Sequence, residues 1–287
     1  MNKTITDDGL LVGGITCFNE ALTLDCGQAF RWSETNDGWH GVAFGKPLTL
    51  KKTDDGFLFS GVSEDEFNNI WNGYFDFDTD YAKLCDSFMS DEYLKKAVEC
   101  YPGIRILNQD TWEALCSFII SQNNNIPRIK GIISRLCENF GEPLGSGDFA
   151  FPSADRIAAL TENDLAPLRS GFRAKYILDA ARKVACGEIR LDSLKTIDID
   201  DARYELMKIK GVGPKVAECT LLYGCGRKEA FPVDVWVKRI MGELYPSGLP
   251  ECVKGYEGVA QQYLFHWRRT VSADNSWSAV PTDKSGR

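Results

Sequence analysis

The chain has 287 residues, of which 44% are hydrophobic and 26% are charged, as expected for a globular protein of one large domain or two to three smaller ones. Its formal net charge of −8 and its pI near 5.0 argue against a protein that coats nucleic acid non-specifically, although positive groups can still gather on one face. No apolar run approaches the length of a membrane helix, the first residues do not form a secretory signal, and the ten cysteines include no Cys-x-x-Cys pair, so we expect reduced thiols, no membrane association and a cytosolic protein.

The N-terminal part, from residue 9 to about 62, is rich in short β-type runs. Asn36-Asp-Gly38 and Asp54-Asp-Gly56 separate some of these runs with sequences that favour tight hairpin turns. The pattern predicts an antiparallel sheet with one covered face. Its expected strands lie at Leu11-Val12, Leu22–Leu24, Phe30–Trp32, Trp39–Phe44, Leu48–Leu50 and Phe57–Phe59.

From about residue 63 the pattern changes to helices. Ser63-Glu-Asp-Glu66, Ser90-Asp-Glu92 and Asp110-Thr-Trp-Glu113 are typical helix starts. A meander followed by a helical series predicts an α+β chain with a segregated sheet. The further expected helices cover 114–122, 128–140, 153–159, 162–169, 174–186 and about 256–269, with a glycine-rich loop at 141–148 and a polar, frayed tail at 272–287.

The stretch Ile209–Cys219 predicts two helices joined by a tight turn. Gly211 and Gly213 bracket Val212 in this turn, and Pro214 suits the first helical position because it has no N–H to leave unpaired. The second helix then begins with exposed backbone N–H groups. Such a helix start is an anion site, and a nucleic-acid phosphate is one candidate ligand.

Lys215, in the first turn of that second helix, is a candidate nucleophile. The positive end of the helix dipole disfavours an ammonium there and favours the neutral amine, which is the reactive form. Cys219 lies four residues further on and faces the same side. Asp234 follows Pro232-Val233 and precedes an apolar periodic run, so we expect it to be the N-cap of the next helix.

These residues resemble a known superfamily of enzymes. Leu206–Tyr223, within a hairpin expected at about 203–223, is similar to the helix-hairpin-helix of the DNA glycosylases named for a Gly/Pro-rich loop and an aspartate, and Lys215 with Asp234 matches the bifunctional members. From about Leu22 to Arg269 the chain resembles the 8-oxoguanine DNA glycosylase family. The resemblance implies an N-terminal antiparallel, TATA-binding-protein-like sheet domain with flanking helices at 1–107, an all-helical helix-hairpin-helix glycosylase domain at 108–271 and a flexible tail at 272–287.

The resemblance assigns base recognition to four positions. Gly27-Gln-Ala-Phe-Arg-Trp32 is similar to a family segment whose glycine carbonyl accepts a hydrogen bond from N7–H of the oxidised base, whereas normal guanine presents an N7 lone pair. Gln261 would read the Watson–Crick edge, Phe265 would stack on the base, and Cys219 would stack on its opposite face. The i, i+4 spacing to Phe265 selects Gln261 over the adjacent Gln262.

Two loops resemble those that hold the DNA around an extruded base. Asn123 would fill the vacated space, and Arg128 and Arg173 would read the partner cytosine. Phe172 would wedge into the base stack; many relatives have tyrosine there, so this chain keeps the stacking surface and loses the hydroxyl. From the residues alone, a helix-capping loop at the asparagines and a C-cap turn at Gly171-Phe172-Arg173 remain alternatives.

We expect no cofactor. The C-terminal part contains only Cys252, so the four-cysteine iron–sulfur ligand set of some relatives is absent, and the two histidines lie too far apart in sequence to indicate zinc. By resemblance, a monovalent cation that also meets a DNA phosphate can bind the backbone carbonyls of Met207, Ile209 and Val212.

The resemblance implies a bifunctional DNA glycosylase and AP lyase of base excision repair. It would excise 8-oxoguanine from duplex DNA, preferably opposite cytosine, through a Lys215 Schiff base and β-elimination. We expect a monomer that acts on damaged double-stranded DNA, in a prokaryotic cytosol or in a nucleus if the host is eukaryotic.

Three alternatives stay open. Alkylated-base glycosylases lack the hairpin lysine, and oxidised-pyrimidine glycosylases usually carry the iron–sulfur cysteines and lack an N-terminal sheet. A non-catalytic helix-hairpin-helix DNA-binding module would need the hairpin but not Lys215, Asp234, Gly27 and Gln261 together.

Overall fold

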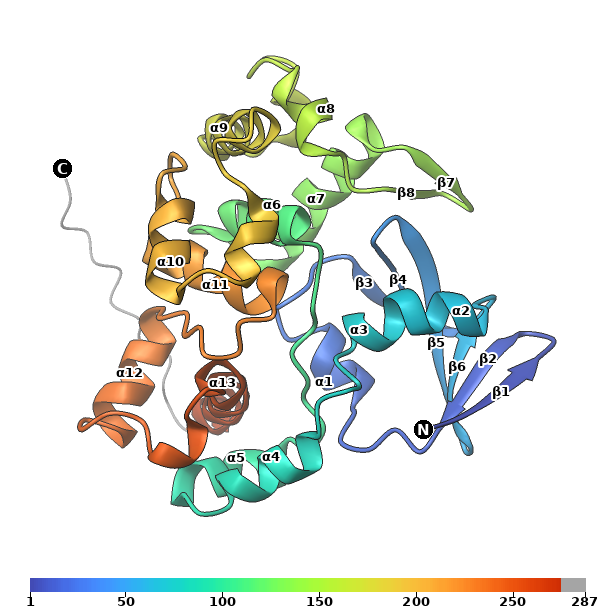
Figure 1. Ribbon diagram of the computed structural model, residues 1–287, viewed down its shortest axis with the longest axis vertical. Helices are drawn as coiled ribbons and strands as arrows, with labels where there is room; N and C mark the ends of the chain where they lie inside the picture. Colours follow the sequence, from blue (N-terminus) through green and yellow to red (C-terminus); the bar gives the residue numbers. More distant parts are fainter. Residues whose placement is uncertain (275–287) are drawn as a thin grey trace.

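The N-terminal part of the protein is a six-stranded antiparallel sheet. The computed structural model, which describes residues 1–274, gives the strand order β1-β2-β6-β5-β4-β3 (Figure 1). The turns predicted at Asn36–Gly38 and Asp54–Gly56 are confirmed, because they join β3 to β4 and β5 to β6. The strands are β1 (Asn2–Thr6), β2 (Gly9–Gly13), β3 (Trp32–Thr35), β4 (Gly38–Ala43), β5 (Lys46–Thr53) and β6 (Gly56–Ser60).

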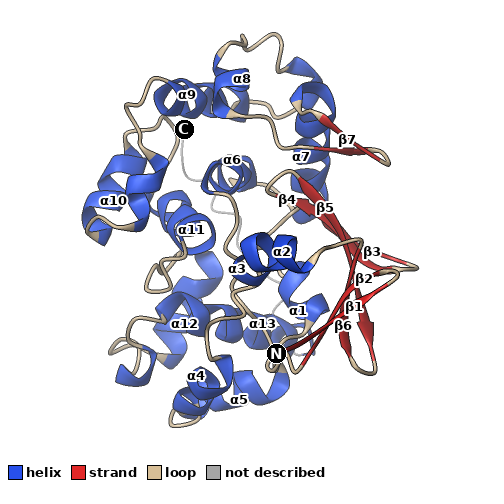
Figure 2. Ribbon diagram, turned by 45° about the vertical axis from the view of Figure 1, so that its right-hand side comes forward, coloured by secondary structure: helices blue, strands red, loops and turns tan. Residues whose placement is uncertain are grey.

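One face of this sheet is covered, as predicted, and short helices lie against it (Figure 2). Aromatic side chains fill the core between the two. Buried and part-exposed side chains alternate along β2 and β6, which is the pattern of a sheet with one face in the core. Phe59 from β6 contacts Phe67 and Phe75, and Trp32 contacts Trp71. The covering elements are α1 (Glu20–Leu24), α2 (Glu64–Glu66), the π-helical turn η1 (Phe67–Trp71) and α3 (Asn72–Tyr74).

Several predicted elements were wrong. Of the expected strand Phe30–Trp32, only Trp32 belongs to a strand, where it begins β3. Leu22–Leu24, expected as a strand, belongs to helix α1, because the Asn19 side chain accepts a hydrogen bond from the Leu22 N–H and caps a helix. The helix expected at 162–169 is a series of turns that ends in the 3₁₀ turn η2 (Ala166–Leu168). Pro167 cannot donate a helical hydrogen bond, and Arg169 then has a left-handed φ of 53°.

The rest of the chain is a set of helices around a second core. Helix α6 packs against α7, α9 and α11, and the last helix, α13, packs against α5 and α12 (Figure 1). Within residues 1–274, no helix is long and apolar enough to cross a membrane. The elements are α4 (Tyr81–Phe88), α5 (Glu92–Cys100), α6 (Thr111–Ser121), α7 (Ile126–Phe140), β7 (Pro143–Gly145), β8 (Asp148–Phe149), α8 (Ala154–Ala158), α9 (Arg173–Ala185), η3 (Leu191–Lys195), α10 (Ile199–Met207), α11 (Pro214–Cys225), α12 (Val235–Leu244), η4 (Glu251–Val253) and α13 (Glu257–Asp274).

The predicted tail, 272–287, was wrong for residues 272–274, which belong to α13, and its remainder lies outside the described residues. The predicted loop at 141–148 contains strand β7 and the start of β8, which form a small hairpin.

A buried arginine joins the sheet to the helices. Arg105 donates to the carbonyl of Asp76 at 2.6 Å, and to those of Thr16 and Cys17 at 2.8 and 2.9 Å. Its guanidinium also lies over the ring of Tyr81, at 4.4 Å from the centroid. Arg105 therefore connects the segment after β2, at Thr16 and Cys17, with Tyr81, the first residue of α4.

Candidate active site

Helices α10 and α11 form the predicted hairpin. Gly211 has a φ of +80°, and a Cβ built there would lie 2.3 Å from Cδ2 of Tyr176, so the turn requires glycine for its conformation and for its space. Gly213, the N-cap of α11, has an ordinary φ of −102° and open space beside it. Asp179 on α9 accepts the Lys210 N–H at 2.7 Å, which fixes the turn against a third helix.

The predicted cation ligands lie around the same turn. Met207 ends α10, Val212 is buried, and the Ile209 carbonyl already accepts the Val212 N–H at 3.0 Å. A cation at these carbonyls stays a prediction. In the part of the chain that the structure describes, no group of three or more His, Cys, Asp or Glu side chains could hold a metal ion.

A cavity of about 440 Å³ opens beside the hairpin. Its walls come from the segment that precedes β3, from α6, from the loop at 124–125 and the start of α7, from α11, from the segment before α12 and the start of α12, and from α13. Residues that are far apart in sequence therefore meet at one place. Six of the predicted site residues line it: Gly27, Lys215, Cys219, Asp234, Gln261 and Phe265.

Lys215 and Cys219 present one face of α11 to this cavity. The half-buried Lys215 has its Nζ 5.3 Å from the centroid of the Phe118 ring, a cation–π distance. Burial raises the pKa of the Cys219 thiol to about 11, although the neighbouring Lys215 opposes the shift. The thiol is therefore neutral at neutral pH and offers a polarisable, uncharged surface.

Asp234 and Gln261 are held by the segment before α12. One oxygen of Asp234 accepts the Val237 N–H at 2.8 Å, which confirms the predicted N-cap. The Gln261 amide donates to the Pro232 carbonyl at 2.6 Å and is only 9% exposed. Its Oε1 has no hydrogen-bond partner among the described residues. A buried acceptor without a partner in a cavity wall indicates a ligand that donates a hydrogen bond.

The adjacent Gln262 also reaches the cavity wall but has a different partner. Its Oε1 accepts the Tyr223 hydroxyl at 2.9 Å. Of the two side chains, Gln261 is therefore the one with its acceptor unused.

Gln28 and Gln109, for which the sequence predicted no role, hold the backbone at Gly27 in place. Gly27 has a φ of +86°. The buried amide of Gln28 donates to the carbonyls of Thr23 and Arg105, each at 2.8 Å, and Gln109 donates to the Gln28 carbonyl at 2.6 Å. The position of Gln28 beside Gly27 was the only signal in the sequence, because these partners lie up to 81 residues away.

The four residues predicted to face the opposite base lie outside the cavity and near one another. Asn123 is exposed with a left-handed φ of 47°, Arg128 is exposed, and Phe172 is 46% exposed. Arg173 is only 2% exposed; it donates to the carbonyls of Gln122 and Asn123, and its guanidinium lies 4.5 Å from the Phe172 ring centroid. Its predicted contact with cytosine would require it to leave these carbonyls.

Further cavity residues were not predicted. They include one cysteine, three aromatic residues and one arginine. Trp236 had a weak signal, since it stands two positions after Asp234 at the start of α12. These five are Cys26, Phe118, Tyr223, Trp236 and Arg269, and the lining also includes Phe30, Ser121, Asn124, Asn125, Ile126, Ile129, Pro232 and Gln262.

Two family models match the chain. The 8-oxoguanine DNA glycosylase N-terminal domain matches residues 14–115, and the HhH-GPD superfamily of base excision DNA repair proteins matches residues 116–251.

Among similar sequences, an N-glycosylase/DNA lyase of Saccharomyces cerevisiae is 34% identical over 251 residues, which are 77% of this chain and 66% of the yeast protein. A DNA-3-methyladenine glycosylase of Bacillus subtilis is 31% identical over 166 residues, 56% of this chain and 55% of that protein. For the first three such relatives, the matched shares of their own lengths are 66%, 59% and 64%.

Among solved structures, the Clostridium acetobutylicum 8-oxoguanine glycosylase/lyase in complex with double-stranded DNA containing cytosine opposite 8-oxoG is 36% identical. The similarity has a TM-score of 0.88 and covers 95% of this chain and 99% of that one. A structure of MBOgg1 with a low-affinity DNA ligand is 41% identical, with a TM-score of 0.88 over 95% of this chain and 100% of that one.

Proposed function

The chain belongs to the 8-oxoguanine DNA glycosylase family, and from this premise we propose that it excises 8-oxoguanine from duplex DNA and then cleaves the strand as an AP lyase. The observation that carries the proposal is the cavity in which the unpaired Oε1 of Gln261 lies with Lys215, Asp234 and Gly27. The cavity offers a hydrogen-bond acceptor, a primary amine and a carboxylate to one bound group.

The cavity suits an extruded oxidised purine. The base would lie between Cys219 and Phe265. Gln261 Oε1 would accept a hydrogen bond from the Watson–Crick edge of a guanine-type base, which is rich in donors. The Gly27 carbonyl would accept N7–H, which 8-oxoguanine has and guanine lacks. One unmet polar contact in a buried site costs about 1–3 kcal/mol, so this carbonyl alone would discriminate roughly ten- to a hundredfold.

Lys215 would act as the nucleophile. Its Nζ forms a bond to C1′ of the deoxyribose through its lone pair while the C1′–N9 bond breaks and its electron pair leaves with the base; Nζ then loses a proton and the base takes one up. Asp234 stabilises the positive charge that develops on the sugar. The C1′–O4′ bond then breaks, O4′ takes up a proton, and C1′ and Nζ form a Schiff base; β-elimination removes a proton from C2′ and breaks the C3′–O bond, so that the 3′ phosphate leaves and the strand is nicked.

The proposed DNA contacts are local, in keeping with the net charge of −8. The hairpin turn would meet a phosphate through backbone N–H groups, Phe172 would wedge into the stack, and Arg128 would read the opposite base. The similar Clostridium structure contains DNA with cytosine opposite 8-oxoG, and we propose this pair as the preferred substrate. We propose a monomer without a cofactor that acts on cellular DNA, in a nucleoid or a nucleus.

Borohydride trapping tests the proposal. Reduction converts a Schiff base into a covalent protein–DNA adduct, so we expect an adduct on a duplex with 8-oxoguanine opposite cytosine and none on the undamaged duplex. Lys215→Gln should abolish the adduct, base release and nicking but keep duplex binding. Lys254→Gln, which changes an exposed lysine outside the hairpin and the cavity, is the control and should behave as the wild type.

Other outcomes would count against the proposal. Base release without an adduct would mean that water is the nucleophile and that Lys215 has another role. Full base release and nicking by Lys215→Gln would refute the assignment of the nucleophile. If 8-oxoguanine DNA gives no adduct and no base release, the substrate is another lesion or the protein is a non-catalytic binding module.

A second candidate, excision of alkylated purines, is favoured by the similarity to the Bacillus subtilis DNA-3-methyladenine glycosylase. Lys215 argues against it, because alkylated-base enzymes of the superfamily lack that lysine. Release of 3-methyladenine from alkylated DNA, without a trapped adduct, would select this candidate.

A further inference from the structure

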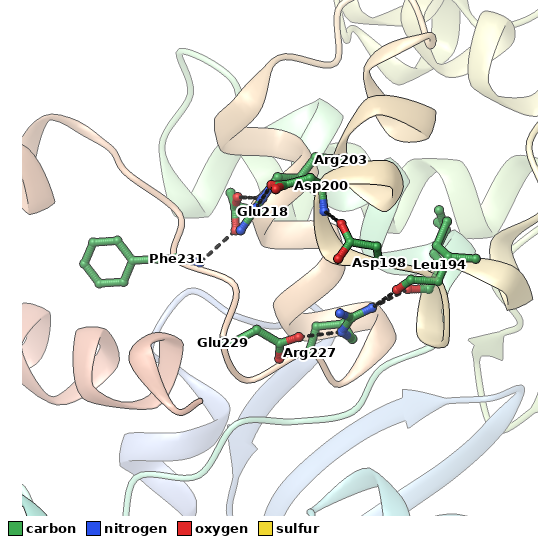
Figure 3. A network of polar contacts seen from close by, with 9 residues as sticks. Leu194, Asp198, Asp200, Arg203, Glu218, Arg227, Glu229 and Phe231 are labelled. Atoms are coloured by element: carbon green, nitrogen blue, oxygen red, sulfur yellow. Dashed lines mark hydrogen bonds and ion pairs between the residues drawn. The ribbon is translucent and has the colours of Figure 1, made fainter. Parts of the chain in front are cut away.

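A single carboxylate, Glu218 on α11, links its own helix to α10 and to the segment that begins at Phe231 (Figure 3). Its Oε2 accepts the Phe231 N–H at 2.7 Å, and its Oε1 accepts from Nε of Arg203 on α10. Arg203 in turn pairs with Asp200, one turn earlier on the same helix. Glu218 itself lies on α11, three residues after Lys215, and its side chain is 13% exposed. The contact therefore ties both hairpin helices to the segment that begins at Phe231.

That segment, 231–234, contains Asp234, which the proposed function places beside the sugar, and Pro232, which also lines the cavity. It has no helix or strand of its own. Its second residue, Pro232, provides the carbonyl that orients the Gln261 amide, and its last residue is Asp234. The hydrogen bond from the Phe231 N–H to Glu218 connects this segment directly to α11, the helix that carries Lys215.

We infer that Glu218 is a positioning residue that sets Asp234 and Gln261 relative to Lys215; the inference rests on the proposed function. Glu218 and Lys215 are on one rigid helix, so the carboxylate fixes the start of the 231–234 segment at a set distance from the nucleophile. Arg203 pairs with the mostly buried Glu218 carboxylate and compensates its charge away from solvent. Glu218 does not line the cavity and does not act on the substrate itself.

The expected effect of losing this contact is on rate. Without Glu218 the Phe231 N–H has no acceptor, and the segment shifts together with the Pro232 carbonyl and Asp234. A displacement of about 1 Å of catalytic groups can cost about a hundredfold in rate. Duplex binding depends on the hairpin turn and the exposed loops and should change little.

The test compares Glu218→Ala with Glu218→Gln, which keeps an acceptor oxygen for Phe231. Base excision is measured in single turnovers with enzyme at saturating concentration, and duplex binding is measured by fluorescence anisotropy. We expect Glu218→Ala to excise about ten- to a hundredfold more slowly with unchanged affinity, and Glu218→Gln to recover most of the rate. The control is Glu205→Ala, which removes a carboxylate on α10 that pairs with Lys208 at 2.6 Å, and it should keep the wild-type rate.

Amide NMR gives a readout that does not depend on activity. In ¹⁵N spectra, Glu218→Ala should change the chemical shift of the Phe231 amide and speed its hydrogen exchange. It should also change the chemical shift of the Val237 amide, which donates to Asp234. Glu205→Ala should leave both resonances unchanged. Wild-type rate in Glu218→Ala, or equal losses of rate and binding in both Glu218 variants, would overturn the inference. If the wild type itself excises no base, the proposed function fails, and unchanged Phe231 and Val237 amides would overturn the positioning role separately.

Discussion

Gly211→Ala should destabilise the hairpin severely, whereas the same change two residues later should not. At Gly211 the φ of +80° costs an L-residue about 1–2 kcal/mol. The new Cβ would also lie 2.3 Å from the Tyr176 ring, and forcing such a contact into a packed site costs about 1–3 kcal/mol. Together they predict a loss of about 2–5 kcal/mol in the free energy of unfolding. Gly213→Ala, with its ordinary φ and open surroundings, should cost less than about 1 kcal/mol.

Equilibrium unfolding in urea, followed by tryptophan fluorescence, measures both changes. Tyr176→Ala separates the two contributions at Gly211: measured in the Tyr176→Ala background, Gly211→Ala should keep the backbone cost and lose the steric one. A Gly211→Ala protein as stable as Gly213→Ala would refute the argument. An unchanged cost after removal of the Tyr176 ring would refute its steric part.

Three further predictions concern the surroundings of the site. Gln28→Leu leaves several buried backbone groups unpaired and should lower the free energy of unfolding by at least about 2 kcal/mol, so an unchanged urea midpoint would contradict the clamp on Gly27. Burial raises the pKa of Glu113 from 4.5 to about 7, although Arg31 opposes the shift. The folded state therefore binds this proton more tightly than the unfolded state, and the free energy of unfolding should fall as the pH rises from about 4.5 through about 7. Glu113→Gln should flatten that dependence in urea titrations at several pH values, and an identical slope would count against it. Phe172→Ala should change stability by less than about 0.5 kcal/mol, since the ring is 46% exposed, yet weaken binding to lesion duplex in anisotropy titrations; unaltered binding would remove it as a wedge.

The features that the sequence predicted well depend on neighbouring residues. The Asn36–Gly38 turn and the Asp234 cap each use groups within three residues of one another, so the pattern contains the whole cause. Lys215 and Cys219 could be placed on one face because a single helix carries both. Leu22–Leu24 failed for the opposite reason: three residues show no period, and the deciding group was the cap at Asn19.

The contacts that complete the site join distant segments, and no local pattern contains them. Arg173 bonds to a carbonyl 51 residues away, and Gln28 is clamped by an amide 81 residues away. An arginine beside an aromatic residue in a loop indicates exposure, whereas the tertiary structure buries this one among carbonyls. Which of two adjacent glutamines is available was likewise decided by Tyr223, 39 residues before Gln262.

The packing of α13 on α5 has a consequence for how the protein is made. Tyr263 donates to the Ile104 carbonyl and meets Cys85, a residue synthesised 178 positions earlier. Helices α4 and α5 therefore leave the ribosome long before their partner exists, and their apolar faces wait uncovered while the intervening chain is translated. Contacts at such separation are slow to form and expose a nascent chain to aggregation. We expect ribosome-bound chains that end before α13 to bind chaperones, and chains in which α13 has left the ribosome to bind them no longer.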